Sequence, residues 1–293
     1  MNYEINNNII NAYVDNNANI TISEYLKSLF IGKKEIHKII CNYLLVNGNK
    51  VSANYILQIN DLISVNYQHE QYDFVASKST LDIVYEDDLL LVVNKPTKII
   101  IHPENKDGID TLANNIAYYF KCNNIKSYVR AIHRLDYETR GLIVYCKISF
   151  FLPLLDNMLA NKLISREYLC IAKGKANANG IINKPIGRDR HNSKKYLVSK
   201  NGKDSTTLYK IVKYFPDHNV SLIHCTLKTG RTHQIRVHLS SIGLPLLNDP
   251  LYGINSKLIC GMGLQAYKLT MTHPLTNQKL VIEIPLDERL VIK

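Results

Sequence analysis

The chain lacks paired cysteines. Its six cysteines are spread over 293 residues, and no two of them have the Cys-x-x-Cys spacing. Several lie in apolar runs, where a thiol behaves as a small buried hydrophobic group. This pattern argues against a zinc site, an iron–sulfur cluster and a disulfide framework. The ten histidines show no paired ligand spacing, so the sequence predicts no metal.

Signals for export and membrane insertion are also missing. The N-terminus, Met1-Asn2-Tyr3-Glu4-Ile5, is polar and does not have the basic-then-apolar order of a signal peptide. No apolar run approaches the length of a membrane span. We therefore expect a soluble, cytoplasmic protein with no membrane partner.

Acidic residues are few relative to basic ones. The chain has 36 Lys and Arg against 25 Asp and Glu, a formal net charge of +11. Such a surplus attracts anionic partners and favours phosphate contacts through counterion release. The alternative is a solvated basic surface without a partner. The length is sufficient for one large domain, or for one medium and one small domain.

The sequence changes character near residue 75, and we predict a small first module at 13–70. Ser23 is a plausible N-cap for a first short helix. A second, basic helix follows at 33–40, with most of its charged residues away from the apolar face. A tight turn at Asn47-Gly48-Asn49 then leads to a return strand near Lys50-Val51, and a last strand closes the module at residues 62–67.

The polar residues 71–79 are predicted to be a linker to a second domain at 80–293. That domain begins with two strands and a helix at 110–121, and strands dominate from residue 165 onward. The window 184–213 has nine basic and two acidic residues, which indicates an exposed loop and hairpin. Because no regular helices separate the strands, we expect an α+β domain with a largely antiparallel sheet.

Two polar motifs stand out in the second domain. His133-Arg134-Leu135-Asp136 leads into a turn at Gly141 and then into an apolar strand. Almost a hundred residues later, the segment 229–238 alternates cationic, polar and apolar residues, so that Arg231, His233 and Arg236 can converge on one surface. Taken alone, Asp136 could cap a turn and Arg236 could be a cation on the surface of a strand.

A single acid among cations suits chemistry on a polyanion. It suits a glycosidase poorly, because such enzymes need a second carboxylate at a fixed distance. A nucleoside or ester hydrolase is a weaker alternative, since no nucleophile elbow lies near Asp136. The Gly-rich phosphate loop and the dinucleotide-binding fingerprint are also absent.

The first module resembles the small αL RNA-binding domain of the S-four type. That family runs from a helix and a basic helix through a strand, a Val-Asn-Gly turn and an Asp-turn to a final strand. Val46-Asn47-Gly48 and Asp61-Leu62-Ile63-Ser64-Val65 occupy the matching places here. The resemblance implies that Lys33, Lys34 and Lys38 meet RNA phosphates.

The second domain, from about Leu81 to Pro285, resembles the RluA-type pseudouridine synthases through five motifs in the family's order. They are Asn94-Lys95-Pro96 with His102-Pro103; His133-Arg134-Leu135-Asp136 with Thr139 and Gly141-Leu142; Arg166-Glu167-Tyr168 with Gly174 and Pro185-Ile186-Gly187-Arg188; Thr229 to Leu239 with Gly243, Pro245, Asp249, Tyr252 and Gly253; and Leu264 with Ala266 and His273-Pro274. The resemblance implies a largely antiparallel mixed central sheet flanked by helices.

The family isomerises uridine within RNA without a cofactor, metal or obligate protein partner. Ribosomal RNA, especially that of the large subunit, is the favoured substrate over tRNA. Asp136 matches the catalytic aspartate, Tyr168 a tyrosine that packs on the target base, and Arg236 an arginine that pairs with the aspartate. Read alone, Tyr168 would be a core aromatic of a strand.

Further residues are implied in substrate binding. Arg134 matches a position that can fill the space of the flipped uridine or hold the adjacent phosphate. Leu264 matches an apolar residue that lines the uracil pocket. Arg231 and His233 are second-rank binding candidates, because they could equally support the local fold.

The chain departs from the family pattern at five positions. Arg140 stands where Ser or Thr is usual, Lys98 and Asn248 replace glycines, and Leu244 and Gln265 replace histidines. None of these changes removes the acid, the tyrosine or the arginine, so they bear on substrate choice more than on activity. The alternative to an enzyme is a non-catalytic RNA-binding protein that acts as an RNA chaperone or ribosome assembly factor. A pure binder, however, has no use for an acid among phosphates.

Overall fold

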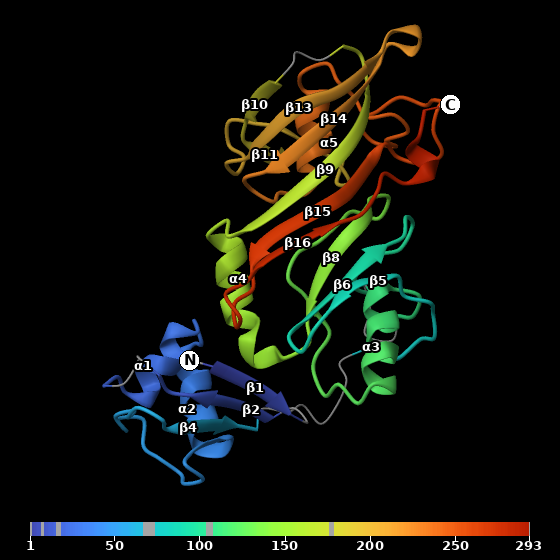
Figure 1. The fold of residues 1–293 in the computed structure, drawn as a ribbon. Coiled ribbons are helices and arrows are strands. Elements are labelled where there is room, and N and C mark those ends of the chain that lie inside the picture. Colours follow the sequence, from blue (N-terminus) through green and yellow to red (C-terminus); the bar gives the residue numbers. More distant parts are fainter. Residues whose placement is uncertain are drawn as a thin grey trace.

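The computed structural model describes residues 2–6, 9–15, 19–66, 74–103, 108–175 and 179–292. These form a ten-stranded sheet, a separate four-stranded sheet near the N-terminus and a two-stranded hairpin (Figure 1). None of the helices in this described part of the chain combines the length and the apolar character that a membrane crossing needs.

The large sheet follows the order β10-β13-β14-β9-β15-β8-β6-β5, with β16 paired to β15 and β7 paired to β8. Its strands are β5 (Ile83–Glu86), β6 (Leu90–Lys95), β7 (Arg130–Ala131), β8 (Arg140–Cys146), β9 (Ile164–Lys173), β10 (Asn179–Asn183), β13 (Thr206–Phe215), β14 (Val220–Leu227), β15 (Leu264–Thr272) and β16 (Lys279–Glu283). The β15–β8 pair is parallel and the other pairs are antiparallel. The predicted α+β class with a largely antiparallel mixed sheet is confirmed.

Helices cover both faces of this sheet. They are α3 (Leu112–Cys122), α4 (Leu152–Ala160) and α5 (Gln234–Ser240), with short 3₁₀ turns at Ser149–Phe151, Pro216–His218 and Glu288–Leu290. The helix predicted at 110–121 is confirmed as α3, whose N-cap Thr111 forms a capping box with Asn114. The basic window contains the expected hairpin, formed by β11 (Ile186–Arg188) and β12 (Tyr196–Val198).

Side chains alternate along the central strands between two apolar cores. On β6, Leu90 and Val92 belong to one core, whereas Leu91 and Val93 belong to the other. Strand β8 is buried on both faces in the same way, which accounts for its nearly continuous apolar sequence. Gly141, on β8, has φ +113, and a Cβ there would clash with the backbone of Ala266 on β15. A glycine is therefore required where the 133–141 motif enters the sheet.

The N-terminal module consists of α1 (Ile22–Ser28), α2 (Lys33–Asn42) and a sheet of order β1-β2-β4-β3. Its strands are β1 (Asn2–Asn6), β2 (Ile9–Tyr13), β3 (Leu44–Val46) and β4 (Leu62–Val65). Two strands thus lie largely before residue 13, where the prediction began the module. The sheet gains them because β2 pairs with β4, a contact between residues about fifty positions apart.

Three local details of this module differ from the predictions. The N-cap of α1 is Thr21, which forms a capping box with Glu24, rather than Ser23. The strand expected near 50–51 is absent from the described residues, where the tight turn closes only a bridge between Val46 and Asn49. Part of the predicted linker, at 71–73, lies outside the described residues.

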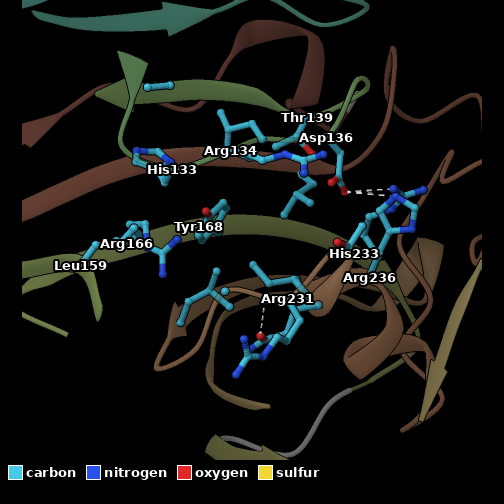
Figure 2. Close-up of a pocket in the computed structure, with 18 of the residues that line it drawn as sticks. His133, Arg134, Asp136, Thr139, Leu159, Arg166, Tyr168, Arg231, His233 and Arg236 are labelled. Atoms are coloured by element: carbon cyan, nitrogen blue, oxygen red, sulfur yellow. Dashed lines mark hydrogen bonds and ion pairs between the residues drawn. The ribbon is translucent and has the colours of Figure 1, made fainter. Parts of the chain in front are cut away.

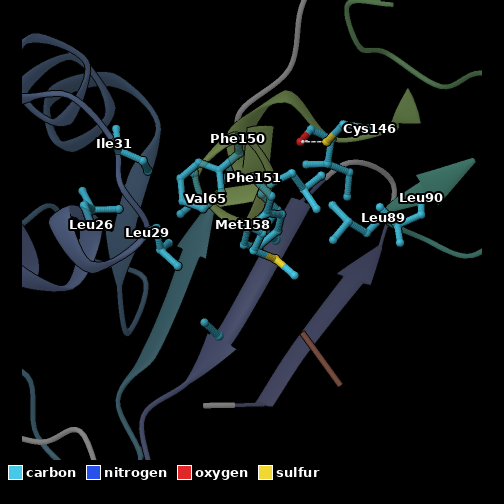
Figure 3. Packing of buried hydrophobic residues seen from close by; sticks show 14 of the residues in the cluster. Leu26, Leu29, Ile31, Val65, Leu89, Leu90, Cys146, Phe150, Phe151 and Met158 are labelled. Atoms are coloured by element: carbon cyan, nitrogen blue, oxygen red, sulfur yellow. Dashed lines mark hydrogen bonds between the residues drawn. The ribbon is translucent and has the colours of Figure 1, made fainter. Parts of the chain in front are cut away.

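The module packs directly on the second domain. Apolar side chains of α1, of its C-cap residue and of β4, including Leu26, Leu29 and Val65, lie in the same core as Phe150 and Phe151 of the second domain (Figure 3). The ring of Tyr3 on β1 makes an edge-to-face contact with Phe151, with centroids 5.5 Å apart. The two parts therefore share one continuous hydrophobic core.

Candidate active site

A pocket of about 420 Å³ opens between the 131–139 segment, β9, β15 and the 230–236 segment. Its size falls within the range of small-molecule sites in proteins. Seven predicted site residues line it: Arg134, Asp136, Tyr168, Arg231, His233, Arg236 and Leu264. The first six of these are labelled in Figure 2. The sequence motifs that are almost a hundred residues apart thus meet at one pocket.

Asp136 lies in the short turn between β7 and β8. Its backbone carbonyl accepts a hydrogen bond from the Thr139 N–H at 3.1 Å, which closes the turn. The carboxylate is 24% exposed and borders the pocket, so it is accessible to a bound substrate. Oδ2 accepts a hydrogen bond from Arg236, which fixes the orientation of the carboxylate.

A buried lysine braces this turn from below. Lys95, at the end of β6, is fully buried, and its ammonium donates hydrogen bonds to the carbonyls of Pro96, Ile99 and Tyr137 at 3.0, 3.0 and 3.2 Å. Burial lowers the pKa of Lys95 to about 8, against the opposing charge of Asp136. The sequence motif containing Lys95 was identified, but this supporting role was not predicted.

Arg236 joins two carboxylates. Its Nη1 lies 2.9 Å from Asp136 Oδ2, while Nε and Nη2 each donate to Asp249 at 2.8 Å. Asp249 also accepts hydrogen bonds from the backbone N–H groups of Leu251 and Tyr252. Burial would lower the pKa of Arg236, but the bonds and charges of both carboxylates outweigh it and raise that pKa. Arg236 therefore remains a cation and orients Asp136.

The segment containing Arg236 is a helix, so its interpretation as a strand was wrong. Residues 234–239 are buried on α5, and His233 stands before the helix with φ +55. This left-handed residue ends the preceding loop and turns the chain into the helix. Arg236 is therefore a buried helical residue. Its three hydrogen bonds to carboxylates replace the hydration that an exposed cation would have.

His233 lies between a tyrosine and the carboxylate. The Tyr252 hydroxyl accepts a hydrogen bond from the Tyr196 N–H at 2.8 Å and lies 2.9 Å from His233 Nδ1. The other ring nitrogen, Nε2, lies 3.9 Å from Asp136 Oδ2. Burial lowers the pKa of His233, although the charge of Asp136 opposes this effect. The imidazole thus connects Tyr252 to the edge of the Asp136 carboxylate.

The inner wall of the pocket is apolar. Tyr168 on β9 and Leu264 on β15 are both 4% exposed and lie on adjacent strands. Burial raises the pKa of Tyr168, so its phenol is protonated at neutral pH. The two side chains provide a flat, mostly apolar surface of the kind on which a base can stack.

Comparisons with known proteins identify the family of this chain. The sequence model of the family described as RNA pseudouridylate synthase matches residues 89–241. A Bacillus subtilis protein named as an uncharacterized RNA pseudouridine synthase, YhcT, is 41% identical over 219 residues, which are 74% of this chain and 72% of that protein. The chain belongs to the RNA pseudouridylate synthase family.

Other relatives agree. Ribosomal large subunit pseudouridine synthase D of Neisseria meningitidis is 37% identical over 238 residues, which are 75% of this chain and 62% of that protein. The solved structure of human RNA pseudouridylate synthase domain containing 1 is 25% identical, with a TM-score of 0.59 over 72% of this chain and 85% of that one. The pseudouridine synthase therefore isomerises uridine in RNA, and the predicted RluA-type resemblance is confirmed.

The predicted residues of the synthase differ in exposure and place. Arg134 and Arg231 line the pocket but are exposed, and Arg231 Nε donates to the Asp204 carbonyl at 3.1 Å. Lys33, Lys34 and Lys38 are exposed on α2 and do not line the pocket. They form a separate basic surface on the N-terminal module.

Some pocket residues of the synthase were missed as site residues. Arg166 lines the pocket from β9, and its Nε is buried without a hydrogen-bond partner in the described structure. Its position two residues before Tyr168 places both side chains on one face of the strand, which is a signal the sequence contained. Asp249 and Tyr252 were recognised only as parts of a motif.

Four of the five departures from the family pattern have local explanations. Lys98 and Asn248, which replace glycines, have φ +61 and +57, so both take the left-handed backbone that glycine adopts most easily. Arg140 is buried and pairs with Asp287, while Gln265 donates to the Pro285 carbonyl at 2.8 Å. Arg140 and Gln265 thus anchor the C-terminal segment and do not reach the pocket.

The buried His133 should make the folded synthase less stable at acidic pH. Burial, followed by the charge of Arg166, lowers the pKa of His133 from 6.5 to about 3. The unfolded chain therefore binds a proton before the folded chain does, and stability is lost as pH falls below about 6.5. Each unit should remove about 1.4 kcal/mol from the free energy of unfolding. Urea unfolding of wild type and His133→Leu at pH 7, 6 and 5 measures this loss, and equal slopes would contradict it.

Proposed function

We propose that this pseudouridine synthase acts on large-subunit ribosomal RNA and that Asp136 carries the reaction. The observation that supports the role of Asp136 most strongly is its partly exposed carboxylate, held by Arg236 at 2.9 Å at the edge of the pocket. The name of the Neisseria relative, a ribosomal large subunit pseudouridine synthase, supports ribosomal RNA over tRNA as the substrate.

The reaction is an isomerisation in which atoms only change places. The bond between uracil N1 and the ribose breaks, the uracil turns, and a bond from C5 to the same ribose carbon forms. C5 loses its proton and N1 gains one. In our proposal, Asp136 either attacks the ribose covalently or removes a ribose proton to release uracil. Arg236 orients the carboxylate in both routes.

The pocket walls suit a uridine that has left its stack. Extrusion costs a few kcal/mol, which contacts in the pocket must offset. We assign the stacking and apolar contacts to Tyr168 and Leu264, and the space vacated in the RNA to Arg134. His233 and Arg231 supply further donors near the ribose and phosphates. Because the phenol of Tyr168 is protonated, any proton that it accepts must follow loss of its own.

The N-terminal module is proposed as an RNA-binding domain of the αL type. Its basic helix α2 carries Lys33, Lys34 and Lys38 on the exposed side, while Ile36 and Ile39 face the core. Lys33 and Lys34 are thus available to phosphates, while the Lys38 ammonium lies 3.5 Å from Glu35 Oε1 and would exchange this exposed ion pair for a phosphate. The shared core with the catalytic domain holds the helix in a fixed place relative to the pocket.

One experiment tests the substrate class. Purified protein is incubated with unmodified large-subunit rRNA or with tRNA transcripts, each labelled with tritium at uracil C5, and tritium release is measured. We expect release from the rRNA and little from tRNA. Release from tRNA alone would contradict the proposed substrate.

A charge variant separates binding from chemistry in the same assay. Changing the three lysines of α2 to glutamine should raise the RNA concentration needed for half-maximal rate and reduce its salt dependence, with the saturated rate unchanged. An unchanged RNA requirement would count against an RNA-binding role for the module.

A further inference from the structure

A second pocket lies across the 230–232 segment from the active site. It measures about 440 Å³ and lies between that segment and the β11–β12 hairpin with the following turn. Gly230, Arg231 and Thr232 line both pockets. A strand of RNA that places one nucleotide in the active site can therefore reach this hollow with a neighbouring nucleotide.

The second pocket has a fixed aromatic wall. Tyr196 lines it from β12, and the backbone N–H of this residue donates to the Tyr252 hydroxyl at 2.8 Å. The Tyr196 ring makes an edge-to-face contact with His233 of the active site, with centroids 5.6 Å apart. An aromatic ring positioned in this way offers a surface on which any of the four bases can stack.

Cations lie beside this ring. Lys203 and Arg231 both line the pocket and are exposed. Arg231 is held by the bond from Nε to the Asp204 carbonyl, so its guanidinium has a defined place at the border between the two pockets. A ring for the base and two cations for the backbone are the components that bind a nucleotide of a single strand.

We propose that the second pocket binds a nucleotide adjacent to the target uridine, with its base against Tyr196 and its phosphate near Lys203 and Arg231. This inference rests on the proposed function, because it extends the same RNA strand beyond the active site. It gives the β11–β12 hairpin a direct part in substrate recognition. It also places the bound neighbour in contact with the Tyr196–Tyr252–His233 chain that reaches Asp136.

The test combines a protein variant with a change in the RNA. The probe is a fluorescent fragment of large-subunit rRNA that contains the target uridine, with abasic sites introduced one at a time at the two positions on either side. Dissociation constants are measured for wild type and Tyr196→Leu, which removes the aromatic face and keeps an apolar side chain. Tyr214→Leu on β13, outside both pockets, is the matched control.

We expect one abasic position to weaken binding to wild type and to Tyr214→Leu by about tenfold, the scale of one base–aromatic stack. Tyr196→Leu should already bind the intact RNA more weakly. In this variant the same abasic site should raise the dissociation constant further by less than about twofold. Lys203→Gln should weaken binding more than Lys200→Gln, an identical change on the same turn outside the pocket.

If every abasic site weakens binding equally in wild type and Tyr196→Leu, the second pocket does not bind the neighbouring nucleotide. Turnover of the intact fragment by wild type is measured in parallel. Turnover with equal abasic effects in wild type and Tyr196→Leu overturns this inference alone. Absence of turnover with any RNA overturns the proposed function on which it rests.

Discussion

Replacing Asp136 with asparagine should lower pseudouridine formation by a factor of at least about 10³, the scale seen when a residue central to the chemistry is removed. The amide has nearly the same shape and still offers an oxygen to Arg236. It cannot attack the ribose or accept a ribose proton as a carboxylate does. Tritium release from uracil C5 of labelled rRNA measures the loss.

Glu138→Gln is the matched control, because it makes the same chemical change two residues away in the same turn. Its side chain contacts Thr97 and does not line the pocket, so we expect a rate close to that of wild type. RNA affinity of Asp136→Asn should be retained, since a negative charge among phosphates is removed. A rate within tenfold of wild type would mean that another group carries the reaction.

Replacing Arg236 with leucine should lower the free energy of unfolding by about 3–5 kcal/mol, the usual cost of leaving a buried charge unpaired. The charge left behind is that of Asp249, whose side chain is fully buried and loses both of its bonds to the guanidinium. Urea denaturation measures this effect. Activity should also fall, because Asp136 loses the donor that orients it.

The double variant Arg236→Leu with Asp249→Leu separates stability from catalysis. Replacing a buried ion pair with apolar residues is often neutral or stabilising. Because Asp249 also accepts hydrogen bonds from the Leu251 and Tyr252 N–H groups, we expect part of the lost stability to return. Activity should not return, since Asp136 still lacks its partner. A single variant within about 1 kcal/mol of wild type would contradict the importance of the buried pair.

The architecture of the catalytic domain was largely predictable from local patterns. Strands such as β6 and β8 are marked by apolar runs, and α3 by the periodicity of its apolar residues and its capping threonine. The pairing of β1 and β2 with the N-terminal sheet was not predictable, because β1 is largely polar, β2 is short and its partner β4 lies far along the chain. Long-range pairing of this kind leaves little local signal.

The site was predictable in its central pair but not in its supports. Asp136 and Arg236 were expected to meet, and they do. The helical form of the 234–240 segment was missed, because its alternation of cationic and apolar residues also fits a strand. Asp249, Lys95 and Tyr252 act through hydrogen bonds across the fold, so their roles depend on distances that the sequence order does not show.

The most direct test of the account is a map of pseudouridine in large-subunit rRNA from cells that lack this protein. The cells are complemented with wild type or with Asp136→Asn. We predict that at least one pseudouridine disappears in the deletion, returns with wild type and stays absent with Asp136→Asn. An unchanged map, or restoration by Asp136→Asn, would contradict it.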